Sequence, residues 1–172
     1  TDTDLRRLAP IHQRLERAGV RNAQVRAPRG DADPLADLTG RINLVLIDAP
    51  CTGTGTWRRN PDSKWRIRPG ALGQRTKIQA ELLDRAAALV ERGGRIAYIT
   101  CSLLAEENGE QVQAFLQRRK DFTTVPPAEM TNALGDRAAA FRATTLIMAE
   151  GLLMTPRRTQ TDGFFVSTLA RR

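Results

Sequence analysis

The chain has 172 residues, of which 41% are hydrophobic, and this size and composition suit one globular domain with a buried core. No stretch is long and apolar enough to span a membrane, and the N-terminus carries no signal-peptide pattern, so we expect a cytoplasmic protein with no membrane partner. The net charge of +8 comes mainly from arginine and favours a polyanionic partner such as nucleic acid, although a solvated basic surface gives the same composition.

Cysteine and histidine are too scarce to predict a metal centre. The chain contains two cysteines and one histidine, His12, whereas a zinc site with four ligands would need unusual help from carboxylates. A structural disulfide is not expected in a reducing compartment. The two cysteines are therefore either inert core residues or reactive thiols.

The first part of the chain predicts a helix, a short strand and a loop before a buried strand. Apolar residues at steps of three and four predict the helix over 4–19. Residues 23–27 predict a short strand, and residues 28–40, rich in proline, glycine and aspartate, predict a loop. The continuous apolar run at 42–48 is typical of a strand that is buried on both faces.

The rest of the chain alternates helices and strands. After a long loop at about 49–70, helices are predicted over 72–92, 105–119 and 136–142. Strands are predicted over 95–100, 122–125, 151–154 and 163–169. This alternation indicates one α/β domain with a mainly parallel sheet.

The two cysteines each follow a predicted strand. Cys51 comes after 42–48 and Cys101 after 95–100, and the helix between these strands makes them neighbours, about 5 Å apart, with their carboxyl ends at one crevice. A thiolate there could attack an electron-poor carbon. Asp48, in the same crevice, could bind the polar edge of a cytosine or simply begin a turn.

Four motifs resemble one family of enzymes. They are DAPCTGTG at 48–55, RRNPDSKW at 58–65, TCSLLAEEN at 100–108 and TDGFF at 161–165. In their order, and in the spacing of the two cysteines, they are similar to the Nol/Nop/Sun (Fmu, RsmB-like) RNA 5-methylcytosine methyltransferases. The combination of the two cysteine motifs is specific, whereas either motif alone is weak.

The resemblance implies a doubly wound, mainly parallel Rossmann-like methyltransferase fold that uses S-adenosylmethionine. Residues 1–172 would form part of the catalytic domain, because the first strand and the glycine-rich cofactor loop are expected upstream of Thr1. The fragment is expected to be inactive alone and to bind the cofactor poorly. The implied reaction is methylation of cytosine C5 in RNA, with ribosomal RNA favoured and transfer RNA as the alternative.

The resemblance also implies roles for the residues at the strand ends. Cys101 would be the nucleophile that adds to C6 of the cytosine and so makes C5 nucleophilic. Cys51 would assist removal of the C5 proton and release of the product. Asp48 and the backbone of Pro50 would hold the cytosine edge.

Further residues are implied in binding the cofactor and the RNA. Asp2 corresponds to the acid that binds the cofactor ribose hydroxyls, and Asp48 is a second candidate cofactor contact. The acid near the adenine has two candidates, Asp31 and Asp33. Phosphate contacts are expected from a basic loop, which would also lower the pKa of a nearby thiol: Arg58, Arg59, Lys64, Arg66 and Arg68.

Two other interpretations compete with the RNA methyltransferase. A non-catalytic basic RNA-binding module could have the same fold, but the presence of both cysteines and Asp48 argues against it. A DNA cytosine methyltransferase would carry a proline–cysteine nucleophile after the strand at 42–48, with no second cysteine after the next strand. The TCS sequence at 100–102 therefore favours RNA as the substrate.

Overall fold

The computed structural model describes residues 1–2, 4–28, 30 and 32–172, which divide into an N-terminal unit (1–39) and a C-terminal unit (40–172). The N-terminal unit contains α1 (Leu5–Leu8), α2 (Ile11–Arg17) and the 3-10 turn η1 (Ala36–Leu38). One helix over 4–19 was predicted, but Pro10 has no N–H to donate and interrupts it. The predicted strand at 23–27 is wrong, because these residues are not paired in a sheet.

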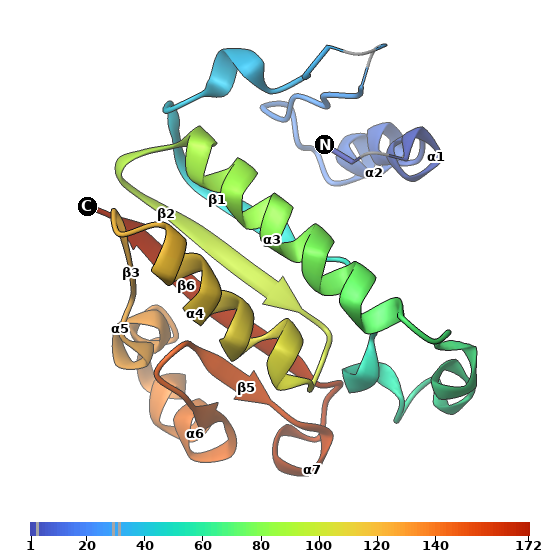
Figure 1. Cartoon of the computed structure of the whole chain (residues 1–172), viewed down its shortest axis with the longest axis vertical. Helices are drawn as coiled ribbons and strands as arrows, with labels where there is room; N and C mark the ends of the chain where they lie inside the picture. Colours follow the sequence, from blue (N-terminus) through green and yellow to red (C-terminus); the bar gives the residue numbers. More distant parts are fainter. Residues whose placement is uncertain (3, 29, 31) are drawn as a thin grey trace. The chain divides into compact units, whose positions relative to one another are not determined.

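The C-terminal unit is built on a six-stranded sheet, shown in Figure 1. Its strands are β1 (Ile42–Asp48), β2 (Val90–Thr100), β3 (Phe122–Thr124), β4 (Leu146–Ile147), β5 (Leu152–Met154) and β6 (Phe164–Arg171). The order is β1-β2-β6-β5-β4, with β3 also paired to β6.

The sheet is mixed, so the prediction of a mainly parallel sheet is wrong. Among the described strands, only β1 and β2 pair in parallel, and every other pairing is antiparallel. The connections explain the two pairings that β5 makes, with β4 and with β6. Residues 148–151 join β4 to β5 and residues 155–163 join β5 to β6, and these segments are too short for the helical crossover that a parallel pair requires.

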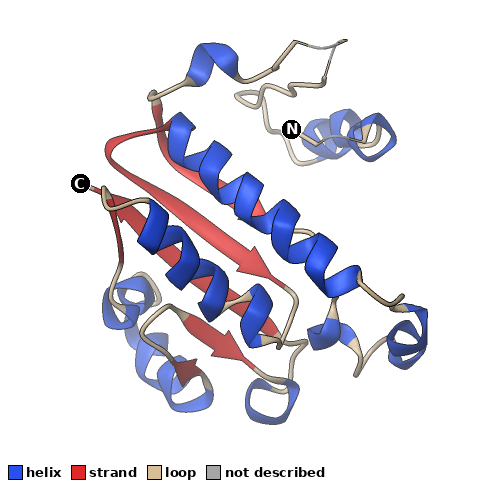
Figure 2. Cartoon of the chain, in the orientation of Figure 1, coloured by secondary structure: helices blue, strands red, loops and turns tan. Residues whose placement is uncertain are grey.

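Two long helices cover one face of the sheet. Figure 2 shows α3 (Ala71–Leu89) and α4 (Gly109–Arg118) side by side over the strands. The helices and strands share one hydrophobic core, which includes Leu83, Ile96, Tyr98, Val112, Phe115, Phe165 and Leu169. The rings of Tyr98 and Phe165 meet edge to face at 6.4 Å, a favourable aromatic geometry that fixes β2 against β6.

β1 is buried on one face only. Ile47 points into the core at 7% exposure, whereas Leu44 and Leu46 on the other face are 56% and 63% exposed. The continuous apolar run predicted burial on both faces, and that prediction is wrong for the described chain. The side chains alternate between two faces, and α3 packs against only one of them.

The remaining elements follow the predicted order with shifted boundaries. α3 ends at Leu89 and β2 begins at Val90, so Gly93, which was expected to follow the helix, lies within the strand, where its backbone is left-handed. The predicted helix at 105–119 forms as η4 (Ala105–Glu107) and α4, and that at 136–142 forms as η5 (Gly135–Arg137) and α6 (Ala138–Thr144). The sequence patterns missed β4 and η1 as well as four other elements: η2 (Thr54–Thr56), η3 (Pro61–Arg66), α5 (Pro127–Asn132) and α7 (Pro156–Thr159).

Candidate active site

Two cysteines meet at the carboxyl ends of the parallel strands. Asp48 at the end of β1 lies opposite Ile99 of β2, so the residues that follow each strand emerge at the same edge. The Sγ atoms of Cys51 and Cys101 lie 3.3 Å apart, and both residues are half-buried. The predicted convergence of the two thiols is therefore confirmed.

A buried carboxylate anchors the loop that carries Cys51. The Thr52 amide donates to Glu107 Oε1 at 2.9 Å, and the Thr52 hydroxyl donates to Oε2. The Gln79 side-chain amide bridges to the same site, donating to Glu107 Oε1 at 3.1 Å and to the Pro50 carbonyl at 2.9 Å. Glu107 is fully buried, so these donors replace the water that its carboxylate has lost.

The loop that carries Cys101 is held from both sides. The Thr100 hydroxyl donates to Asn108 Oδ1 at 2.6 Å, and Asn108 Nδ2 donates to the Ser102 carbonyl at 2.9 Å. The Gly55 amide, from the other loop, donates to the Cys101 carbonyl at 2.9 Å. The two cysteine loops therefore form one hydrogen-bonded unit.

The turn before β6 packs onto this unit through a glycine pair. The Gly163 amide donates to the Gly55 carbonyl at 2.8 Å. A Cβ on Gly55 would lie 2.3 Å from the Gly163 carbonyl oxygen, and one on Gly163 would lie 2.6 Å from Leu103 Cδ2. Position 55 therefore requires a glycine, because the backbones of two loops approach closely there.

The two thiols differ in acidity. The Cys51 thiol donates a hydrogen bond to the Cys101 sulfur, which lowers the pKa of Cys101 to about 7. The same hydrogen bond, together with burial, raises the pKa of Cys51. The two shifts favour a thiolate at Cys101 and a thiol at Cys51. The acidity comes from the second cysteine, not from the basic loop as predicted.

Asp48 and Pro50 lie beside the thiol pair with different freedom to bind a ligand. The exposed Asp48 carboxylate accepts no hydrogen bond from the residues that the structure describes, and its charge acts on Cys101. The carbonyl of Pro50 already accepts the Gln79 amide. The Asp48 carboxylate is thus available to a bound molecule, whereas the Pro50 carbonyl is already engaged by Gln79.

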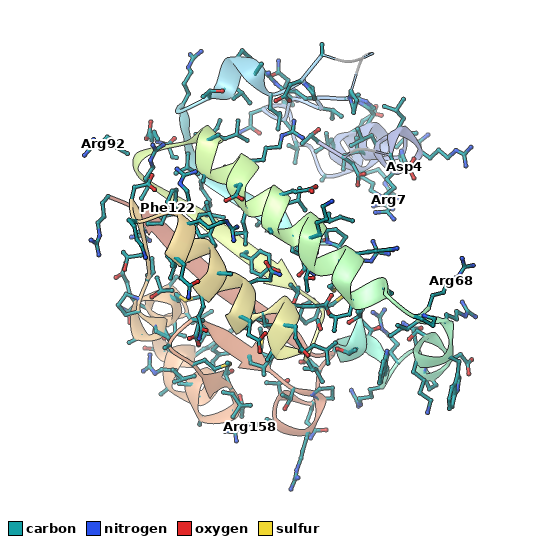
Figure 3. All side chains as sticks on the ribbon, viewed as in Figure 1. Asp4, Arg7, Arg68, Arg92, Phe122 and Arg158 are labelled. Carbon is teal, nitrogen blue, oxygen red and sulfur yellow. The ribbon has the colours of Figure 1, made fainter. Side chains whose placement is uncertain are left out.

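A cavity of about 480 Å³ opens next to Cys51, and its lining includes Thr52, Arg66, Arg68 and Arg75. Figure 3 shows Arg68 pointing outward from the loop between η3 and α3. Three arginines line this one cavity, and their positive charge suits an anionic ligand. Arg75, at this cavity, has no motif in the sequence that would have identified it.

The other basic residues of the loop have protein partners. Arg58 donates to the Gln160 carbonyl at 3.1 Å, and Arg59 forms an ion pair of 2.8 Å with Asp162. Lys64 lies over the ring of its neighbour Trp65 at 4.8 Å, and Trp65 is 79% exposed. Arg58 and Arg59 therefore help to hold the turn before β6.

The candidate cofactor acids of the N-terminal unit make local contacts. Asp2 Oδ1 accepts the Asp4 amide at 2.8 Å, and Asp33 Oδ1 accepts the Leu35 amide at 3.0 Å. Asp31 lies outside the described residues. In the described parts of the chain, no group of three potential metal ligands occurs and no helix could cross a membrane.

Residues 1–170 match the family described as 16S rRNA methyltransferase RsmB/F. The chain belongs to this family. The RsmB/F proteins are part of the Nol/Nop/Sun group of S-adenosylmethionine-dependent RNA 5-methylcytosine methyltransferases, which confirms the resemblance in the motifs.

Individual relatives agree with this assignment. The chain is 34% identical to ribosomal RNA small subunit methyltransferase B of Citrobacter koseri, over 99% of the chain and 36% of that protein. It is 40% identical to the protein of the same name from Salmonella typhi, over 70% of the chain and 28% of that protein. The chain thus spans about a third of the length of these relatives.

The fold also matches solved structures. The structure of PH0851 covers 99% of the chain with a TM-score of 0.82 at 30% identity, and the match spans 36% of that protein. NSun6 from Pyrococcus horikoshii, solved with SFG, covers 99% of the chain with a TM-score of 0.70 at 25% identity, over 40% of that protein. The mixed sheet is therefore a methyltransferase arrangement.

Proposed function

We propose that this RsmB/F-family chain methylates cytosine C5 in 16S rRNA through a covalent bond between Cys101 and C6 of the base. The observation that carries the proposal is the thiol pair, in which the sulfur atoms of Cys51 and Cys101 lie within hydrogen-bond distance of each other, at 3.3 Å. This contact favours a thiolate at Cys101, and a thiolate is the form of cysteine that attacks carbon. The family match favours ribosomal over transfer RNA.

The first step is attack on the base. The Cys101 thiolate adds to C6, a carbon–sulfur bond forms, and the electron pair of the C5–C6 double bond becomes available at C5. The free carboxylate of Asp48 accepts a hydrogen bond from the exocyclic amino group of cytosine and so orients the ring. Pro50 shapes the same wall, because Gln79 and Glu107 hold its carbonyl and the following residue in place.

The cofactor site would use carboxylates of the chain. S-adenosylmethionine, when bound, supplies an electrophilic methyl group. Asp48 suits its polar groups, since this exposed carboxylate has no hydrogen-bond donor from the described residues. Asp2 would bind the ribose hydroxyls, and Asp31 or Asp33 would lie near the adenine, as the family resemblance implies.

Cys51 acts in the last step. Once Cys101 is bonded to C6, its sulfur is neutral, so the hydrogen bond to the Cys101 thiolate and the charge of that thiolate, both of which raised the pKa of Cys51, are lost. Cys51 can then lose its proton to solvent and act as the base that removes the proton from C5. The C5–H electrons re-form the double bond, the bond from C6 to sulfur breaks, and Cys101 leaves as a thiolate.

The RNA backbone is expected to lie along the cavity beside Cys51. Arg66, Arg68 and Arg75 line it and would bind phosphates. Arg58, Arg59 and Lys64 remain proposed phosphate contacts, although Arg58 and Arg59 also hold the turn before β6. The exposed ring of Trp65 offers a surface on which a base could stack.

The two cysteine variants test this function, because they must fail differently. Both variants are made in a full-length protein that contains this chain, because the chain spans only about a third of its relatives. With 16S rRNA and S-adenosylmethionine, Cys101→Ala should give neither methylation nor adduct. Cys51→Ala should attack and transfer the methyl group but release its product slowly, so a nuclease-sensitive protein–RNA band should accumulate on a denaturing gel. The double variant is the control and should give no band.

A band with Cys101→Ala and none with Cys51→Ala would reverse the two roles. Methylation that survives in Cys101→Ala would overturn the covalent mechanism. Loss of methylation in Cys51→Ala with no adduct would assign Cys51 to the attack or methyl-transfer step, not to product release.

A further inference from the structure

The thiol pair has a second possible chemistry, which is bond formation between its own sulfur atoms. A disulfide bond is about 2.0 Å long, so the two Sγ atoms, now 3.3 Å apart, need to approach by only about 1.3 Å. The loops that carry them are already joined by the hydrogen bond from the Gly55 amide to the Cys101 carbonyl. Closure therefore requires no large rearrangement of the chain.

The surroundings make the pair accessible to a small oxidant. Both cysteines are half-buried rather than enclosed, and the cavity of about 480 Å³ reaches Cys51. They are the only cysteines of the 172 residues, so each has the other as its sole internal partner. The partner that would resolve an oxidised sulfur is thus already in contact with it.

We propose that Cys51 and Cys101 form an oxidation site, at which a peroxide converts the pair into a reversible intramolecular disulfide. The Cys101 thiolate attacks one oxygen of the peroxide, the O–O bond breaks, and Cys101 becomes a sulfenic acid. The other oxygen leaves as hydroxide or alkoxide, which takes a proton from solvent to become water or an alcohol. The Cys51 sulfur then attacks the Cys101 sulfur, the S–S bond forms, and the hydroxyl leaves with the Cys51 proton as water. Two electrons pass from the sulfur pair to the peroxide.

This oxidation has a consequence that rests on the proposed function. The disulfide occupies both the sulfur that attacks C6 and the sulfur that accepts the C5 proton. The oxidised protein therefore cannot form the adduct with RNA. A dithiol that reduces the bond by exchange returns both groups, so the site would switch methylation off reversibly.

The test follows the thiols directly and needs neither RNA nor cofactor. The chain is exposed briefly to hydrogen peroxide, quenched with catalase, unfolded in denaturant with iodoacetamide and weighed by mass spectrometry. Untreated protein should take up an alkyl group on each of its two cysteines. Treated protein should take up no alkyl group, and its mass should be lower than that of the reduced, unalkylated chain by two hydrogen atoms. Reduction with dithiothreitol before alkylation should restore the addition of an alkyl group to both cysteines.

Single variants supply the matched controls. Treated Cys51→Ala lacks the resolving thiol and should stop at a sulfenic acid that dimedone captures. Treated Cys101→Ala should keep its remaining thiol under the same brief exposure. A monomer band on a non-reducing gel should accompany the loss of alkylation in the wild-type chain.

Three results would overturn the proposal. The wild-type chain could keep both thiols after peroxide, gain oxygen atoms in place of the disulfide, or form only dimers joined between chains. A different result would contradict the proposed function alone. In that case the wild-type chain forms the disulfide as expected, but Cys101→Ala still methylates RNA.

Discussion

Removing the Glu107 carboxylate should destabilise the protein through the loop that carries Cys51. The carboxylate accepts the Thr52 amide, the Thr52 hydroxyl and the Gln79 amide. In Glu107→Ala, the Thr52 amide loses its acceptor and Gln79 keeps only Pro50. Each buried donor without a partner costs about 1–3 kcal/mol, and the lost methylene groups leave a cavity. We expect the free energy of unfolding to fall by about 3–5 kcal/mol.

Glu107→Gln should cost less, about 1–2 kcal/mol, because a neutral amide loses only the extra strength of hydrogen bonds to a charge. Its oxygen can keep the Thr52 and Gln79 amides, while its nitrogen donates to the Thr52 hydroxyl. The neighbouring Glu106 is exposed, so Glu106→Ala is the matched control and should change stability by less than about 0.5 kcal/mol.

The free energy of unfolding of all three variants is measured by urea denaturation, with tryptophan fluorescence as the signal, and the midpoints are compared at constant slope. The expected order of stability is Glu106→Ala, then Glu107→Gln, then Glu107→Ala. If Glu107→Ala were as mild as Glu106→Ala, the carboxylate would not be holding the loop. If Glu107→Gln were as damaging as Glu107→Ala, the charge rather than the hydrogen bonds would carry the effect.

Three further predictions concern the thiols, the cavity and the glycine pair. The rate of Cys101 alkylation should rise with pH around a midpoint of about 7, and in Cys51→Ala this midpoint should move up toward the ordinary thiol value of about 8.5; an unmoved midpoint would assign the acidity elsewhere. Arg68→Ala should reduce the salt slope of RNA binding by about one unit, and an unchanged slope would return Arg68 to the solvated surface. Gly55→Ala should destabilise the protein by more than about 2 kcal/mol, because the new Cβ would lie 2.3 Å from a carbonyl oxygen. Gly73→Ala, which has open space around it in α3, should stabilise the protein by about 0.5–1 kcal/mol. Equal effects of the two substitutions in thermal melts would contradict this prediction.

The sequence by itself determined the parallel half of the C-terminal unit and the place of its cysteines. The apolar run at 42–48 and the helical period after it are local patterns, and local patterns specify strands, helices and their order. The right-handed crossover then makes β1 and β2 neighbours, so the meeting of Cys51 and Cys101 followed from residues read one after another. The family motifs added the reaction.

The tertiary structure alone decided the direction of the other strands and the support of the site. β6 pairs with β2, whose residues lie far earlier in the chain, as in the pairs of Thr100 with Phe165 and Arg95 with Ala170. Glu107 lies within the predicted helix at 105–119, yet it is buried and binds Thr52, 55 residues away. Such contacts are missing from any local pattern, because hydrogen-bond donors and acceptors are matched only when the packed core brings distant loops together. The acidity of Cys101 has the same origin, since it depends on a second sulfur placed 3.3 Å away by the register of β1 and β2.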